Sequence, residues 1–232
     1  MKLTIQKILS LALTAVLAST ACAADADQIL RAMSAKLAAA KQFSYHAHRE
    51  IDPALLEGRD VAEKAQVDVS VARPNQLAAR SVSKERVMRF LADGRNLTVF
   101  DETKNVYAQV PMRASLDGLI AQLDEKFGFT PPLAEFALSD PYKNFREQAR
   151  TVSYVGTEKI GGFLGLGGVE CHHLALKGKV ADGELWVAVG DGLPRKLTAT
   201  FKQADHPQVR IAFSSWNLTA PVPAAEIGRA HV

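Results

Sequence analysis

Alternation of apolar and polar residues runs through most of the chain and predicts an antiparallel sheet. In residues 65–71, three valines on one face alternate with polar residues on the other, as in a half-buried strand. Between residues 90 and 110, turn signals at Asp93-Gly94 and at 102–105 separate short segments rich in β-branched and aromatic residues. This stretch therefore predicts a three-stranded meander around which the sheet is built.

Two regions with helical periodicity interrupt the strands. Apolar residues recur at helical spacing in 26–41 and in 116–127, and a proline-led segment at 130–138 predicts a second short helix. The segment 140–146 that follows is either irregular or a further turn of helix. Further strands are expected at 43–51, 76–82, 85–92, 97–101, 106–110, 151–160, 169–178, 184–189, 195–203 and 209–218. We therefore expect an α+β domain of about ten strands, with an N-terminal helix and a central helical insert. Asp182-Gly183 and Asp191-Gly192 are expected to be turns.

Several strands are apolar on both faces, which bears on how the sheet is covered. Phe90-Leu91 and Leu185–Val189 are examples, whereas an antiparallel strand with one wet face would alternate. The helices must then cover the second face, and a sheet of this size tends to curl around what covers it. A curved sheet closed by helices either encloses an apolar cavity or has its concave face filled by them. The sequence leaves these alternatives open.

Both ends of the chain carry segments that we expect to lie outside the folded domain. Residues 1–23 have a basic start, an apolar run too short to span a bilayer, and the small-residue pattern Ala21-Cys22-Ala23, which predicts a secretory signal peptide. The alternative is a lipoprotein signal with Cys22 as the lipidated residue. Residues 226–232 match the in-frame translation of a common sequencing adapter and are expected to be non-native. The domain is then predicted to be 24–225, in the periplasm.

Composition and charge exclude several classes of partner. The chain has 232 residues, is 47% hydrophobic and carries a formal net charge of +3, part of which lies in the leader. This gives one globular domain a sizeable core and a near-neutral surface, with no reason to invoke nucleic acid. We also expect no stable membrane insertion after removal of the leader.

Candidate motifs for chemistry are weak. Residues 161–168 are rich in glycine, but a strand follows where a phosphate loop requires a helix. Cys171 and His173 share one face of a predicted strand, as do His46 and His48 of another, which leaves a metal site conceivable only if these strands meet. A thiol nucleophile is disfavoured because the residue after Cys171 points to the opposite face. We therefore expect no cofactor, no metal and no enzymatic activity.

Several motifs carry a family resemblance. They are Asp93-Gly-Arg through Tyr107-Ala-Gln-Val-Pro111, Phe127-Gly-Phe with Pro132-Leu-Ala-Glu-Phe136, Cys171-His-His-Leu-Ala175, Leu185-Trp-Val, and Gly192-Leu-Pro-Arg-Lys-Leu197. In these the chain resembles the DUF2092 family of predicted periplasmic proteins, and more distantly the LolA/LolB-like lipoprotein carriers. The resemblance implies a curved antiparallel half-barrel closed by helices, with a capacity to receive acyl chains.

These considerations predict a soluble periplasmic binding module for a lipid, an acyl chain or a lipidated protein. The alternative is a protein-interaction or envelope-sensing module with a filled core. The residues expected to form the cavity wall are Phe90, Leu97, Val99 and Trp186. Arg195 and Lys196, which follow the turn ending at Pro194, are candidates for a cationic rim, although a solvated strand end is the simpler interpretation.

Overall fold

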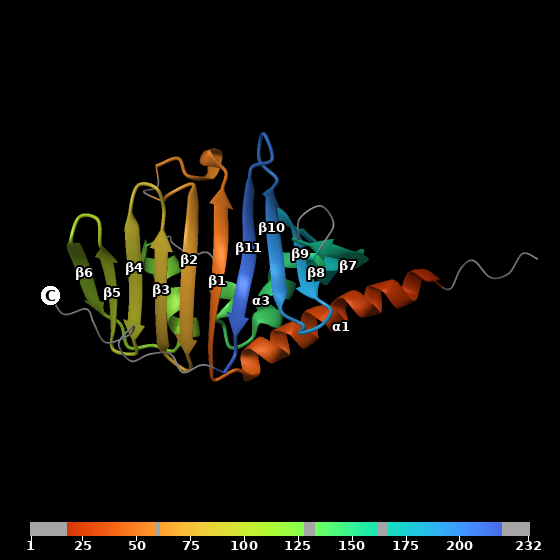
Figure 1. Cartoon of the computed structure of the whole chain (residues 1–232), viewed down its shortest axis with the longest axis horizontal. Coiled ribbons are helices and arrows are strands. Elements are labelled where there is room, and N and C mark those ends of the chain that lie inside the picture. Colours follow the sequence, from red (N-terminus) through yellow and green to blue (C-terminus); the bar gives the residue numbers. More distant parts are fainter. Residues whose placement is uncertain (1–17, 59–60, 128–132, 162–166, 220–232) are drawn as a thin grey trace, which may run out of the picture.

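The fold is an open, curved antiparallel sheet of eleven strands, built from two meanders. The computed structural model describes residues 18–58, 61–127, 133–161 and 167–219. The strand order is β6-β5-β4-β3-β2-β1-β11-β10-β9-β8-β7, so each meander pairs its strands in chain order. Figure 1 shows the strands side by side from β6 to β7.

The turns of the first meander follow from local chemistry. Gly94 has a positive φ of 86°, and the Asp93 side chain accepts hydrogen bonds from the next backbone N–H groups. The strands of this meander are β1 (Gln42–Ile51), β2 (Lys64–Ala72), β3 (Gln76–Val82), β4 (Val87–Asp93), β5 (Asn96–Asp101) and β6 (Val106–Pro111). Those of the second are β7 (Ala149–Ile160), β8 (Val169–Gly178), β9 (Ala181–Ala188), β10 (Pro194–Phe201) and β11 (Gln208–Asn217).

The two meanders meet in the middle of the sheet, where β1 pairs with β11. A bulge interrupts this pairing: Tyr45 lies opposite Trp216, but Ala47 lies opposite Phe213. The extra residue in β11 keeps Trp216 on the same face as Phe213, which simple alternation would not allow. Both rings therefore join the main core beside Tyr45.

Helical segments cover the concave face. The chain crosses beneath the sheet from β6 to β7 through α2 (Leu116–Phe127), the short 3-10 helix η2 (Ala134–Phe136) and α3 (Pro141–Gln148). The helix α1 (Ala18–Ala39) packs against α3 and β7, and Figure 1 shows its N-terminal end extending beyond the sheet. A further 3-10 turn, η1 (Pro53–Leu55), follows β1.

The helices begin where local sequence permits. The Asp140 side chain caps α3 by accepting the Lys143 N–H, and Pro141 occupies its first turn. In α1, Leu30, Met33 and Leu37 form the buried stripe that faces the core. These elements complete the α+β half-barrel, and the fold class predicted from the sequence is confirmed.

The structure corrects three local expectations. Asp182-Gly183 lies inside β9 rather than in a turn, because the chain already reverses at 179–180. Of the helix expected at 130–138, the described part contains only η2, whereas of the two alternatives for 140–146 the further helical turn is the one observed, as part of α3. Helix α1 begins at Ala18, before the expected start at Ala26. Most of the expected leader, and all of the expected non-native tail, lie outside the described residues.

Candidate functional site

Two adjoining cavities lie between the concave face of the sheet and the helical cover. The first has a volume of about 320 Å³ and lies under the first meander. The second has a volume of about 540 Å³ and lies under the second meander. Val61 and Leu133 line both, so the two cavities meet near the middle of the sheet.

The wall of the first cavity follows from strand register. Residues paired directly across antiparallel strands point to the same face, so one row of pairs supplies neighbouring side chains. The central row consists of Tyr45, Val69, Ala79 and Phe90. Opposite this row, α2 contributes Leu119, Ile120 and Leu123. The cavity is therefore apolar over most of its length.

The second cavity is more mixed in character. Its sheet wall is apolar and includes Leu197, Val209 and Ile211, and Phe145 of α3 faces them. Its polar lining residues are Glu135, Asn144, Gln148, Asp182 and Gln203. This cavity thus combines an apolar wall with hydrogen-bonding groups, several of which come from η2 and α3.

Glu135 is the carboxyl group whose titration depends most on this environment. Burial raises the pKa of Glu135 to about 7, since desolvation penalises the charged form. Burial raises the pKa of the Tyr45 phenol as well, with a smaller contribution from the neighbouring Glu135 charge. The two groups therefore lie close enough to interact where the cavities adjoin.

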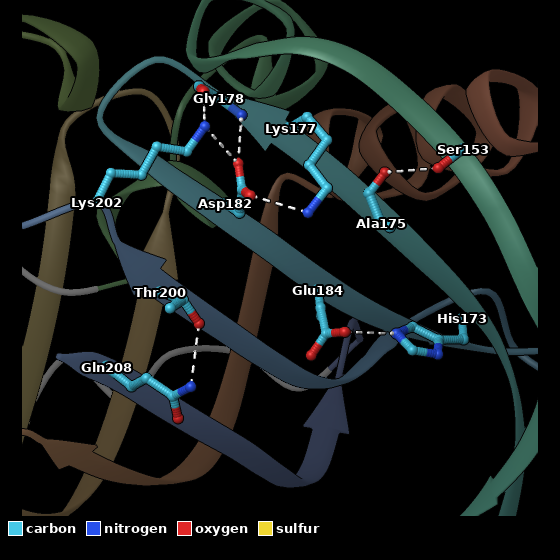
Figure 2. A network of polar contacts seen from close by, with 10 residues as sticks. All are labelled: Ser153, His173, Ala175, Lys177, Gly178, Asp182, Glu184, Thr200, Lys202 and Gln208. Atoms are coloured by element: carbon cyan, nitrogen blue, oxygen red, sulfur yellow. Dashed lines mark hydrogen bonds and ion pairs between the residues drawn. The ribbon is translucent and has the colours of Figure 1, made fainter. Parts of the chain in front are cut away.

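An ion-pair network braces one edge of the second cavity. Asp182 Oδ2 accepts a hydrogen bond from Lys177 Nζ at 2.8 Å, and its Oδ1 accepts from Gly178 N at 3.2 Å and lies 3.0 Å from Lys202 Nζ. Figure 2 shows Lys177 and Gly178 of β8, and Lys202 directly after β10, converging on Asp182 of β9. The hydrogen bonds from the two lysines lower the pKa of Asp182 to about 2. The network holds the β8–β9 hairpin next to β10.

Arg73 fastens the helical cover to the sheet. Its guanidinium donates to Ala137 O and Leu138 O, each at 2.8 Å, and to Ala40 O at 3.2 Å at the end of α1. The guanidinium also lies over the Phe43 ring. One side chain therefore satisfies carbonyls from two separate helical segments.

Two of the expected wall residues line the first cavity. Phe90 and Leu97 are among its lining residues, whereas Val99 is not. Val99 pairs with Phe90 and so shares its face of the sheet, one strand nearer the β6 edge. The structure thus brings these three residues together beneath the first meander.

Trp186 lies on the other face of the sheet. In β9, Leu185 and Val187 belong to the main core, and alternation turns Trp186 outward. There it packs with Cys171 and stacks on the His173 ring at 4.3 Å. Among the described residues that line the two cavities, Trp186 does not appear.

The two expected rim cations are also placed away from the cavities. Arg195, the second residue of β10, pairs at 2.5 Å with Asp191 of the preceding turn. Lys196 lies over the outward-facing Trp186 ring, 4.2 Å from its centre. Neither residue is among the described lining residues of the two cavities, because both sit on the outer side or at the strand start.

The residues considered for a metal site do not converge. Three strands separate β1, which carries His46 and His48, from β8, which carries Cys171 and His173. Within the described ranges, no cluster of three metal-ligating side chains is found. Burial raises the pKa of the Cys171 thiol, which opposes formation of a nucleophilic thiolate.

Sequence reasoning missed two lining residues of the cavities, Arg49 and Glu135, and also the position of Trp216 beside Tyr45 in the core. Arg49 follows Phe43, Tyr45 and Ala47 at period two, so alternation alone would have placed it on the buried face. Glu135 gave no such signal, because its environment depends on how the helical cover packs. The face on which Trp216 lies could not be predicted by alternation, because the bulge in β11 changes it.

The open sheet with a hollow beneath its helical cover defines an α+β half-barrel class of protein. The chain belongs to the family of predicted periplasmic proteins DUF2092, whose model matches residues 26–226. Both the family and the periplasmic location expected from the sequence are thereby confirmed. Of the helices that the structure describes, none is both long and apolar enough to cross a membrane.

Three solved structures are similar at low sequence identity. LprF from Mycobacterium bovis is 14% identical with a TM-score of 0.49, covering 87% of this chain and 96% of that chain. The MucA/MucB complex of Pseudomonas aeruginosa is 15% identical with a TM-score of 0.47, and the match covers 87% of this chain and 60% of that chain. A LolA superfamily protein, NE2245 from Nitrosomonas europaea, is 14% identical with a TM-score of 0.40, and the match covers 88% of this chain and 97% of that chain. No curated protein sequence matches the chain. All three TM-scores lie below 0.5.

Proposed function

We propose that this protein is a periplasmic binding protein for a hydrophobic ligand, either a lipid, an acyl chain or a lipidated protein, and that it is not an enzyme. The observation that carries the proposal is the pair of adjoining cavities, of about 320 and 540 Å³, beneath the concave face. Volumes of several hundred Å³ with mainly apolar walls are typical of small-molecule sites.

Binding would work by reversible burial of apolar surface. Removing about 200 Å² of ligand surface from water supplies roughly 5 kcal/mol, before the costs of ordering are subtracted. The row from Tyr45 to Phe90 and the facing side chains of α2 provide this surface. No covalent step and no cofactor are required.

Tryptophan fluorescence offers a direct test, because the two tryptophans lie on opposite faces. The Trp216 ring lies 4.7 Å from the ring of Tyr45, which lines the first cavity, whereas Trp186 faces outward. In a Trp186→Phe host, titration with decanoate should shift the Trp216 emission and saturate. A host that shows no saturable shift, and no heat of binding by calorimetry, would contradict the proposal.

Filling the first cavity should block binding. Ala79 is a small residue in the middle of the wall, between Val69 and Phe90. We expect Ala79→Phe to weaken decanoate binding at least tenfold, measured by calorimetry. Its free energy of unfolding should fall by less than the roughly 1–3 kcal/mol typical of overpacking, since the ring enters empty space.

The matched control for Ala79→Phe is Ala212→Phe. Ala212 is exposed on the outer side of β11, so the same enlargement there should leave binding unchanged. A folded Ala79→Phe variant that binds decanoate as tightly as its parent would remove the first cavity from the proposal.

The second candidate function is a protein-interaction or envelope-sensing module. It is favoured by the edge strand β6, which is exposed along its whole length and carries Val106 at 56% and Tyr107 at 58% exposure. Such an edge offers unpaired backbone groups to a partner strand. Native mass spectrometry of protein purified from periplasm separates the two candidates: retained lipid supports the first, and a clean ligand-free mass favours the second.

A further inference from the structure

A buried arginine lines the otherwise apolar first cavity. Arg49 lies on β1, on the same face as Tyr45 and Ala47, and is only 6% exposed. Its Nη2 donates to Ala62 O at 3.0 Å. Its Nε is buried and has no hydrogen-bond partner among the described residues.

This charge is uncompensated within the described chain. No described carboxylate forms an ion pair with Arg49, and burial alone lowers its pKa from the ordinary value. Glu135, whose carboxyl lines the neighbouring second cavity, is not its partner. A buried cation without a carboxylate is a costly arrangement, and such a group in a native protein calls for an explanation.

The position of Arg49 makes the first cavity amphipathic along its length. Arg49 is four residues beyond Tyr45 on β1, and Ser81, Ser83 and Arg86 line the same end from β3 and the turn after it. The opposite end is formed by Leu77 and Leu97. At about 3.3 Å per residue, the six-residue step from Leu77 to Ser83 spans about 20 Å. The cavity is thus elongated, with hydrogen-bonding groups at one end and aliphatic groups at the other.

We propose that the first cavity takes a single-chain anionic amphiphile, with its carboxylate on the Arg49 guanidinium and its acyl chain running past Tyr45 toward Leu77 and Leu97. This inference rests on the proposed function and specifies its ligand class. An ionised carboxylate supplies the acceptor that Nε lacks, as a charge-assisted hydrogen bond in a dry site. The chain lies between the sheet and Leu119 and Leu123 of α2.

The test compares ligands that differ only in the head group. Decanoate and decan-1-ol are titrated by calorimetry into the parent and into Arg49→Met, with the decanoate carboxyl ionised. We expect the parent to bind decanoate at least tenfold more tightly than decan-1-ol. Arg49→Met should lose this preference while binding decan-1-ol as before, because methionine keeps the apolar stem. Arg210→Met, at an exposed arginine of β11, should behave like the parent.

Arg49→Lys provides a second variant that retains the charge. It should keep part of the preference for decanoate, and circular dichroism confirms that each variant is folded. Equal affinity of the parent for both probes, with both bound, would overturn the head-group assignment and leave the proposed function standing. Absence of binding of either probe would overturn both. Acetate alone, if it stabilised the parent as much as decanoate does and did so through Arg49, would identify a site for small free anions instead.

Discussion

The Arg73→Met variant is expected to lose about 2–4 kcal/mol of the free energy of unfolding, measured by urea denaturation. The reason is that its guanidinium donates to carbonyls at the end of α1 and at Ala137 and Leu138, all of which lose their donor together. A hydrogen bond from a charged donor contributes about 1.5–3 kcal/mol, and partly buried carbonyls left unpaired add to the loss. Methionine retains the apolar packing of the side chain over Phe43.

Arg80→Met is the control for this change. Arg80 lies on the adjacent strand β3 and pairs with Glu102 at 3.2 Å, with 41% of its side chain exposed. Exposed ion pairs contribute about 0.2–1 kcal/mol, so this variant should lose much less stability. Equal losses in the two variants would show that Arg73 does not fasten the cover. Hydrogen exchange should also rise in 133–139 for Arg73→Met alone.

The Glu135→Gln variant should change how stability depends on pH. The folded-state pKa of about 7 lies above the value of about 4.3 for an unperturbed glutamate, so the folded chain holds the proton longer than the unfolded chain. Stability of the parent therefore falls as the pH rises through this window and stays low above it. Glutamine carries no charge, so the variant should be more stable than the parent at about pH 8 and similar near pH 4.

The size of this difference should be about 1–2 kcal/mol at about pH 8. The full shift corresponds to about 4 kcal/mol, and solvent reaching the half-buried side chain reduces it. Glu125→Gln, on the exposed side of α2, should leave the pH profile of the parent unchanged. Parallel pH profiles for Glu135→Gln and the parent would show that this carboxyl is solvated.

Local patterns predicted most elements because they depend on neighbouring residues. The bounds of β3 and α2 agree with the periodicity, and the turn at Gly94 agrees with its dipeptide signal. The turn predicted at Asp182-Gly183 was wrong because that prediction used only neighbouring residues. This dipeptide, although typical of turns, lies in β9, where Asp182 binds two lysines from neighbouring segments. Such tertiary contacts override local propensity.

The candidate site was harder to predict because it depends on which face of the sheet is concave. In 185–189, both faces are apolar, so no local pattern distinguishes Leu185, which lies in the main core, from Trp186, which lies outside it. Which face is concave depends on the register of the β1–β11 pair, and that pair joins distant parts of the chain. Phe90 and Leu97 could be proposed from sequence because they belong to one local meander.

The strand order described above also sets the order in which the chain can fold. Within each meander, pairing requires only short loops, whereas β1 and β11 come from opposite ends of the described chain. Closing such a long loop costs entropy before its contacts repay it, so we expect these two strands to dock last. Pulse-labelled hydrogen exchange should show protection of β3 and β9 before that of β11; simultaneous protection of all three would exclude this sequence of events. The second cavity, whose lining combines Ile51 and Val61 with residues of β9, β10 and β11, would then come into being only in the final step, when the two separately formed halves join.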